Sequence, residues 1–205
     1  LDVIEISRDD LKVLEPNVEI DAKGATYFKC DSHSTPGEFM EEMITYLKKV
    51  GVSFYPNEKV EDLEVTNGKI TAIKTDKQRL IADEFVLAAG SWSASLSKKL
   101  GLRLLLQAGK GYRINCTQNT GISIPAILAE AKAAVTPMHG FTRFAGTMEI
   151  AGINHVIRKE RVEAISNAVT RYYPKIKLTS EEKSQATCGL RPVSPDGLPY
   201  IGKSS

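Results

Sequence analysis

Arg191 lies in the segment of this sequence that is best suited to chemistry, the run from Gly189 to Gly202 (GLRPVSPDGLPYIG). Pro192, Pro195 and Gly197 follow the arginine, so the backbone there is stiff and turns in a fixed direction. A guanidinium held in this way is pre-organised to bind a planar carboxylate through two parallel hydrogen bonds. A structural ion pair beside a proline-rich turn is the alternative, and the residues alone leave it open.

A second candidate is the apolar run from Phe85 to Ala89, which Gly90 closes. Consecutive apolar residues of this kind predict a strand that is covered on both faces, as in a parallel sheet. The small residues Ala88, Ala89 and Gly90 at its carboxyl end would let a large ligand lie against the backbone. A tight strand-to-helix turn is the alternative interpretation.

Tyr112 follows Gly109-Lys110-Gly111, a segment that is too short for a phosphate-binding loop and that precedes a strand instead of a helix. Its hydroxyl is a candidate to contact a substrate carboxylate, and packing within a strand is the alternative. The three histidines, His33, His139 and His155, have no metal-ligand spacing, and each is expected in a loop. No metal site and no hydrolase motif is predicted.

The elements that position these residues follow a mixed pattern. Thr35-Pro36 begins a helix whose apolar residues recur at helical spacing as far as Val50. Asn67-Gly68 predicts a hairpin turn between strands at 60–66 and 69–74. Further strands are expected at 52–55, 84–89, 111–117, 126–131, 134–138, 142–148 and 185–190, with a short capped helix from Ser7 and a longer helix over 162–172. The order predicts an α/β block joined to an α+β block that contains an antiparallel sheet.

Composition excludes several functional classes. A net charge of +2 with scattered lysines and arginines gives no field for nucleic acid. No apolar run approaches the length of a membrane span and no signal peptide occurs, so no integral membrane segment is expected. The cysteines, Cys30, Cys116 and Cys188, are widely spaced and odd in number, which predicts reduced thiols in a cytoplasmic protein.

Taken in order, these segments resemble the D-amino-acid oxidase family of FAD-dependent oxidoreductases, and within it the D-amino-acid dehydrogenases and glycine oxidases. The motifs that carry the resemblance are ADEFVLAAGSWS from Ala82, KGY from Lys110, FAGTME from Phe144 and the arginine segment from Gly189. The resemblance spans nearly the whole chain. It implies a partial Rossmann-like FAD domain, residues 29–104 and 191–205, interleaved with an antiparallel-sheet substrate domain, residues 1–28 and 105–190.

The same resemblance implies roles for individual residues. Arg191 would hold the substrate carboxylate, and Met148 would lie near the flavin ring. Val60 would contact the adenine end of FAD through its backbone, and the segment Ala88–Gly90 would line the nucleotide side. FAD is therefore the expected cofactor, and a small-molecule carboxylate is the expected substrate.

The reaction that the resemblance implies is oxidation of the Cα–N bond of an amino acid, most plausibly a D-amino acid, by hydride transfer to flavin. Hydrolysis of the resulting imine gives a 2-oxo acid and ammonia. The protein needs only to orient the substrate, which agrees with a sequence that offers no base constellation. The alternatives are a 2-hydroxy acid or glycerol-phosphate oxidoreductase and, from another class, a non-catalytic carboxylate-binding module. The sequence identifies neither the substrate side chain nor the electron acceptor.

Two departures from the family pattern carry further expectations. The GxGxxG fingerprint, which places a pyrophosphate at a helix N-terminus, belongs upstream of Leu1, and the segment that closes over the flavin belongs after Gly202. We therefore expect a central fragment of an enzyme, inactive alone, that binds FAD weakly or not at all. Ala134 stands where glycine-oxidase-like members place a tyrosine, which argues against glycine oxidase activity and leaves room for a bulkier substrate.

Overall fold

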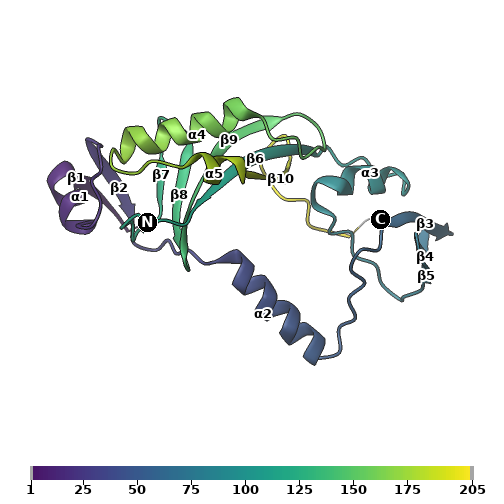
Figure 1. Cartoon of the computed structure of the whole chain (residues 1–205). Coiled ribbons are helices and arrows are strands. Elements are labelled where there is room, and N and C mark those ends of the chain that lie inside the picture. The colour runs from purple at the N-terminus through teal and green to yellow at the C-terminus, as the bar shows by residue number, and fades with distance from the viewer. Residues whose placement is uncertain (1, 204–205) are drawn as a thin grey trace. The chain divides into compact units, whose positions relative to one another are not determined.

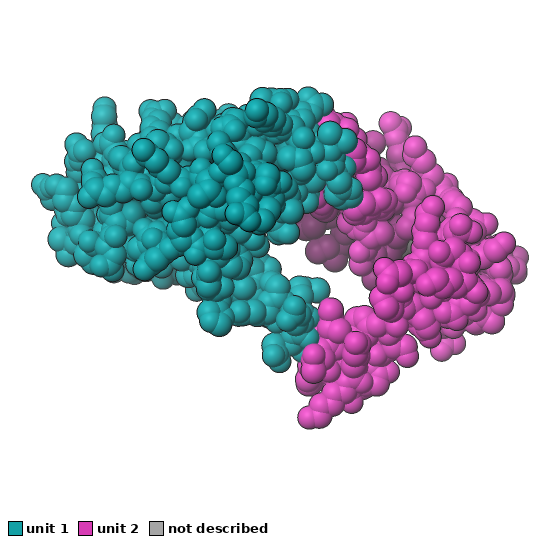
Figure 2. Space-filling model, in the orientation of Figure 1, with its two compact units in different colours: residues 1–42, 110–149, 155–189 teal, residues 43–109, 150–154, 190–205 magenta. Residues whose placement is uncertain are grey.

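The computed structural model describes residues 2–203. The chain forms two compact units, each assembled from stretches that are far apart in the sequence (Figure 2). Unit 1 comprises residues 1–42, 110–149 and 155–189, and unit 2 comprises residues 43–109, 150–154 and 190–205. Because both units take in several segments, neither half of the sequence corresponds to one unit.

The elements follow one another as in Figure 1. The helices are α1 (Arg8–Leu14), α2 (Pro36–Lys49), η1 (Gly90–Trp92, a 3₁₀ turn), α3 (Ser93–Lys98), α4 (Lys159–Tyr172) and α5 (Ser180–Ser184). The strands are β1 (Val3–Ser7), β2 (Gly24–Phe28), β3 (Val60–Thr66), β4 (Lys69–Thr75), β5 (Arg79–Leu80), β6 (Gln107–Cys116), β7 (Ala126–Leu128), β8 (Ala133–Met138), β9 (Phe141–Ile150) and β10 (Thr187–Val193).

A five-stranded sheet in the order β10-β6-β9-β8-β7 is the centre of unit 1, and α4 lies across one of its faces (Figure 1). The pairs β7–β8 and β8–β9 are antiparallel, with Ala134 opposite Ala145. The core forms where this face meets the helix. Its most deeply buried large side chains include Tyr112 and Ile114 of β6, Phe144 of β9, and Ile165 and Val169 of α4. Burial of each such side chain contributes about 1.5–3 kcal/mol to folding.

The N-terminal segment adds a small antiparallel pair, in which β1 and β2 run with Val3 opposite Phe28 and α1 lies between them in sequence. Ser7 caps α1 and forms a reciprocal capping box with Asp10, which confirms the predicted short helix. The carboxylate of Glu15, just after α1, is buried and accepts hydrogen bonds from the backbone N–H groups of Ser123 and Ile124. These bonds fasten the segment to the loop before β7.

Unit 2 contains the antiparallel sheet β3-β4-β5 and the short helices η1 and α3. The turn between β3 and β4 is Asn67-Gly68, with φ angles of 50° and 75°. Positive φ at both central residues is the requirement of the type I′ hairpin turn, so the prediction is confirmed. Lys99, at the end of α3, forms an ion pair of 2.9 Å with Asp62 of β3 and ties the helix to the sheet.

Two predicted strands are wrong. Residues 52–55 and 84–89 have no ladder partner in the described part of the chain, and neither is a strand. Val86 is 89% exposed, whereas a strand of a covered parallel sheet would bury it. An apolar run makes a strand only where another strand satisfies its backbone groups, and none lies beside either segment. Helix α2 forms as predicted, yet its apolar stripe buries no residue, and Phe39 is 57% exposed.

The strands and the helix of the second half of the sequence occur where they were predicted. β8 and β9 cover the expected ranges, and β6 ends one residue before the expected 117. β7 is shorter than expected, β10 begins two residues later than expected, and α4 begins three residues earlier. A mixed α/β fold with an antiparallel sheet is therefore confirmed. None of the helices within residues 2–203 combines the length and the apolar character that crossing a membrane requires.

Candidate functional site

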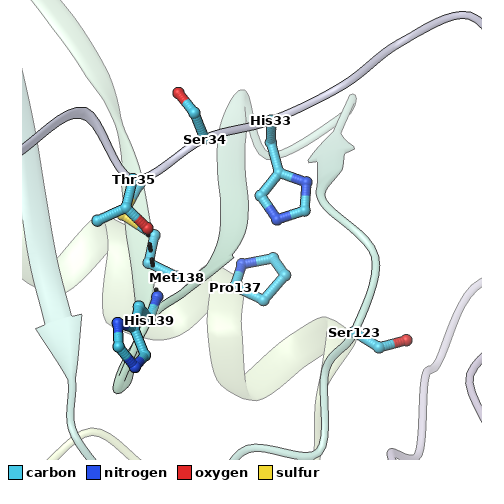
Figure 3. A pocket seen from close by; sticks show the side chains of 7 residues that line it. All are labelled: His33, Ser34, Thr35, Ser123, Pro137, Met138 and His139. Carbon is cyan, nitrogen blue, oxygen red and sulfur yellow. Dashed lines mark hydrogen bonds between the residues drawn. The ribbon is translucent and has the colours of Figure 1, made fainter. Parts of the chain in front are cut away.

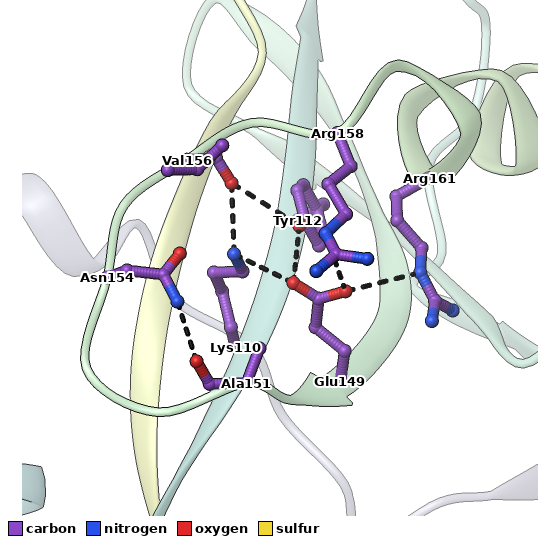
Figure 4. A network of polar contacts seen from close by, with 8 residues as sticks. All are labelled: Lys110, Tyr112, Glu149, Ala151, Asn154, Val156, Arg158 and Arg161. Atoms are coloured by element: carbon purple, nitrogen blue, oxygen red, sulfur yellow. Dashed lines mark hydrogen bonds and ion pairs between the residues drawn. The ribbon is translucent and has the colours of Figure 1, made fainter.

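Lys110, Tyr112 and Glu149 form a buried polar cluster at the end of the sheet in unit 1 (Figure 4). Lys110 and Tyr112 alternate on β6 with residues of the opposite face, so both point toward the α4 side. The Lys110 Nζ lies 2.7 Å from Glu149 Oε1, and the Tyr112 hydroxyl donates to the same oxygen over 2.9 Å. Lys110 Nζ also donates to the Val156 carbonyl over 2.9 Å. The side chains of Lys110 and Glu149 are only 1% and 7% exposed.

Arg158 and Arg161, at the start of α4, approach the second oxygen of Glu149 at 3.6 and 3.5 Å. The Lys110 ammonium, together with Tyr112 and Arg158, lowers the pKa of Glu149, and Glu149 raises the pKa of Lys110. Both residues are therefore charged at neutral pH. A lysine that stays protonated is neither a general base nor a Schiff-base nucleophile, so this cluster holds structure in place instead of moving protons.

The Tyr112 hydroxyl was a candidate to contact a substrate. In the structure it is occupied by Glu149 and lies 3.5 Å from the Val156 carbonyl, in a side chain that the core buries. A substrate would reach this hydroxyl only after those contacts were broken. This arrangement agrees with the packing alternative, and a substrate contact of Tyr112 stays a prediction.

The alternation of buried and exposed side chains along β9 reverses at Thr147. Thr142 and Phe144 face the core, so regular alternation would bury residue 148 and expose residue 149. Instead Met148 is 55% exposed and Glu149 is buried. Thr147 has a φ of 54°, in the left-handed region, as expected of a β-bulge that shifts the alternation of a strand. This one residue therefore turns Glu149 inward toward Lys110 and leaves Met148 on the surface.

Thr147 is also a strained residue. The left-handed region costs an L-residue about 1–2 kcal/mol, and a branched Cβ is uncommon there. Its Oγ1 is buried and has no hydrogen-bond partner within the described residues. Strain and an unpaired buried hydroxyl at one position mark candidate functional sites more often than scaffold positions.

Arg191 lies on β10 in unit 2, and its side chain is exposed. No carboxylate in residues 2–203 forms an ion pair with it, so the structural ion pair that the sequence left open has no partner there. The turn that follows is well fixed. The Ser194 hydroxyl donates to the Leu198 carbonyl over 2.7 Å, and the Leu198 N–H, donating to Asp196, lowers the pKa of that carboxyl. The backbone of Arg191 thus leads into a hydrogen-bonded turn.

The small-residue segment Ala88–Gly90 lies in the same unit as Arg191. Ser91, directly after it, donates to the Leu190 carbonyl over 3.4 Å, which brings this segment beside the start of the arginine motif. Gly90 has a φ of 53°, and a Cβ added there would meet no atom within 4 Å. Val60, also in unit 2, is half-buried and begins β3 opposite Thr75. The hydrogen bond of Ser91 therefore links the segment Ala88–Gly90 to β10, the strand that carries Arg191. Val60 lies on a separate sheet.

A cavity of about 270 Å³ in unit 1 lies near the turn between β8 and β9 (Figure 3). The His139 N–H donates to Thr35 Oγ1 over 3.3 Å, and its Nδ1 lies 2.7 Å from Glu38. The His139 side chain is 82% exposed, as expected for a loop residue. No group of three or more His, Cys, Asp or Glu side chains in the described part of the chain could hold a metal ion. This small, open cavity does not have the enclosed character of a ligand site.

Sequence reasoning missed Lys110, Thr147 and Glu149. The first and last of these stand 39 residues apart, and nothing in their local sequence announces an ion pair. The one available signal was a lysine at a strand position that the alternation predicts to be buried, because a buried charge requires a partner of opposite charge. The sequence did not predict the left-handed backbone conformation of Thr147, because threonine rarely adopts it.

Comparisons with known proteins give one consistent answer. A family model described as "DAO: FAD dependent oxidoreductase" matches residues 2–205. A D-amino acid dehydrogenase of Vibrio vulnificus (strain CMCP6) is 30% identical over 184 residues, which are 88% of this chain and 44% of that protein. A second D-amino acid dehydrogenase, from Helicobacter pylori (strain ATCC 700392 / 26695), is 28% identical over 96% of this chain and 48% of its own length.

Among solved structures, glycine oxidase from Bacillus cereus ATCC 14579 superposes with a TM-score of 0.80 at 22% identity. The match covers 98% of this chain and 55% of that one, and at this identity it shows the fold alone. The chain spans about half the length of the curated relatives that it matches.

Proposed function

The chain belongs to the family of FAD-dependent oxidoreductases described as DAO, and from this premise we propose that its protein oxidises the Cα–N bond of an amino acid. The similarity of nearly the whole chain to D-amino acid dehydrogenases carries the proposal and favours a D-amino acid. The products are a 2-oxo acid and ammonia, after water hydrolyses the substrate imine. FAD, when bound, supplies the acceptor for the hydride that leaves the substrate Cα.

The proposal assigns the two parts of the chain to two tasks. Residues 29–104 and 191–205 contribute to flavin binding, and residues 1–28 and 105–190 contribute to substrate binding. The residues fit a flat nucleotide cofactor in one respect: the segment before Gly90 has no ladder partner within the described residues, and a Cβ added at the glycine would meet no atom within 4 Å. Val60 and Ala88–Gly90 are the residues that would hold the nucleotide part of FAD.

In this proposal Arg191 binds the substrate carboxylate. Its exposed guanidinium lacks a carboxylate partner within residues 2–203, and the hydrogen-bonded turn that follows fixes the direction of the backbone there. Met148 lies on the surface directly beyond the strained Thr147 and offers a soft apolar wall to the reacting end of the substrate. None of these residues has to accept a proton, because the task of the protein in this reaction is to orient the substrate for hydride transfer.

We also propose that the protein is cytoplasmic. Cys30, Cys116 and Cys188 are all free thiols, and burial raises the pKa of Cys116 to about 11, so that thiol is inert. Free thiols of this kind support a reducing compartment. Fractionation of the source cells with an antibody against the chain tests this, and recovery with the membrane or secreted fraction would contradict it.

The test is anaerobic mixing of the flavin-containing protein with D-alanine, D-glutamate, a 2-hydroxy acid and glycerol 3-phosphate, followed by flavin absorbance. Bleaching by D-amino acids supports the proposal. Bleaching by the 2-hydroxy acid or glycerol 3-phosphate alone replaces it with the alternative oxidoreductase. A protein that binds small acids and no flavin would be the carboxylate-binding module.

Arg191→Ala tests the role of the guanidinium within that enzyme. Loss of a desolvated, hydrogen-bonded charge contact should raise KM for amino acids by about two to three powers of ten. Arg171→Ala, which removes an exposed arginine of α4, is the matched control and should leave KM unchanged. An unchanged KM in Arg191→Ala would remove this residue from the site.

A further inference from the structure

The sheet of unit 1 carries two arginines on the face opposite α4. On β6, Tyr112 and Ile114 are buried against the helix, so Arg113 between them points to the other side. On β9, Thr142 and Phe144 are buried in the same way, and Arg143 between them also points to the other side. β6 and β9 are neighbours in the sheet, so the two arginines share one face.

Both guanidinium groups are held in place by neutral side chains. Arg113 donates through its Nε to the Thr187 hydroxyl of β10 over 2.8 Å. Arg143 donates through its Nε to the amide oxygen of Asn115 of β6 over 3.1 Å. Each guanidinium is bonded through its Nε alone. Its two Nη nitrogens have no hydrogen-bond partner within residues 2–203. The free ends are the forks that bind carboxylates with two parallel hydrogen bonds.

No acidic side chain neutralises this pair. Within residues 2–203 neither arginine forms an ion pair, whereas Arg8, Arg79, Arg158 and Arg161 each have a carboxylate. Arg143 is half-buried and also lies over the ring of Phe141, 5.4 Å from its centroid. Burial and, secondarily, the charge of Arg113 lower the pKa of Arg143, yet a guanidinium stays charged in water. Two positive charges on one face, neither with a carboxylate partner within residues 2–203, favour binding of an anion.

Small residues on the same face leave room beside Arg143. Ala145 follows it by two positions on β9, and Ala134 of β8 stands directly opposite Ala145. Both alanines are half-buried, and each presents only a methyl group on this face. The exposed Met148 lies three residues further along β9.

We propose that Arg113 and Arg143 bind the side-chain carboxylate of an acidic amino acid, so that a dicarboxylic amino acid is the substrate class of this enzyme. This inference rests on the oxidation proposed above. A neutral substrate would leave both forks without a partner, whereas a dicarboxylate satisfies them.

Binding to the 205-residue chain, measured by calorimetry without flavin, tests the site directly. Glutarate is the dicarboxylate probe, and butyrate is the monocarboxylate of similar length. We expect glutarate to bind at least about 10-fold more tightly than butyrate, because a charge-assisted fork contact is worth that much or more. Equal affinities, or no binding of glutarate, would overturn the proposal. Tighter binding of inorganic phosphate than of glutarate would overturn it too, because the site would then be a phosphate site.

Arg113→Gln and Arg143→Gln should each weaken glutarate binding by about 10-fold or more and leave butyrate unaffected. Arg171→Gln makes the same charge change on α4 and should alter neither. Arg143→Lys keeps the charge but loses the fork, so it should restore only part of the affinity. Circular dichroism of each variant verifies that the fold is intact, and glutarate affinity that survives both glutamine substitutions contradicts the assignment.

Flavin reduction in the flavin-containing protein separates this inference from the function on which it rests. Faster bleaching by D-glutamate than by D-alanine supports both. Bleaching by D-alanine with no preference for D-glutamate overturns the substrate class and leaves the oxidation standing. Glutarate binding without bleaching by any amino acid supports the anion site and overturns the oxidation.

Discussion

Replacement of Thr147 by glycine should stabilise the protein, although glycine in a strand normally does the opposite. The change removes left-handed strain worth about 1–2 kcal/mol and a buried, unpaired hydroxyl worth about 1–3 kcal/mol. It forfeits about 0.8 kcal/mol for the buried methyl group and about 0.5–1 kcal/mol for the greater freedom of glycine in the unfolded chain. The gains exceed the losses by about 1–2 kcal/mol, which for a chain of this length raises Tm by about 2–8 °C.

The assay is thermal and urea unfolding followed by circular dichroism, with Thr136→Gly as the matched control. Thr136 is a half-buried threonine of the adjacent strand β8 without a positive φ, so its replacement should lower stability by about 0.5–1 kcal/mol. Thr147→Ala keeps the left-handed backbone and removes the hydroxyl together with the γ-methyl group, so it should recover only part of the gain. If Thr147→Gly is destabilised as much as Thr136→Gly, neither strain nor an orphaned hydroxyl exists at this position.

Two further predictions concern the buried cluster. Tyr112→Phe keeps the ring and deletes the 2.9 Å hydrogen bond to Glu149, so Tm in a melting experiment should fall by several degrees. Tyr46→Phe, at an exposed position, is the control and should leave Tm unchanged. An unchanged Tm of Tyr112→Phe combined with a raised KM would instead make Tyr112 a substrate contact. The folded-state pKa of Glu149 lies below its ordinary 4.5, and the folded-state pKa of Lys110 lies above its ordinary 10.5. The contribution of this pair to stability is therefore full between pH 4.5 and pH 10.5. It falls as pH drops below 4.5 and falls again as pH rises above 10.5. Urea unfolding across pH checks this, and an acid limb of the same slope in Glu149→Gln would show that another group is responsible.

The sequence was most informative where the signal is local. Ser7 with Asp10 caps α1, Asn67-Gly68 forms the hairpin turn, and the apolar spacing over 162–172 gives α4, all as predicted. Each of these signals involves residues within a few positions of one another, so its energy does not depend on what the rest of the chain does. The resemblance to the family likewise rested on motifs that can be read along the chain.

The sequence misled where an element depends on a distant partner. The apolar run over 84–89 satisfies the pattern of a covered strand, but no described strand pairs with it, and Val86 faces solvent. The short strand β2 escaped notice because its residues gain their order from pairing with β1, not from their own pattern. Strand propensity reflects the neighbours that a strand finds, and those neighbours are not written in the strand itself.

The sequence by itself determined the family, the helices and turns set by local signals, and the types of residue available for chemistry. Only the tertiary structure decided which charges meet: Lys110 pairs with Glu149 across 39 positions, and Arg113 and Arg143 share one face of the sheet with no carboxylate partner within residues 2–203. It also decided that Thr147 reverses the alternation of β9, which places Glu149 inside and Met148 outside. The physical reason is that burial and electrostatic pairing depend on distances in space, which strand pairing sets and sequence spacing does not.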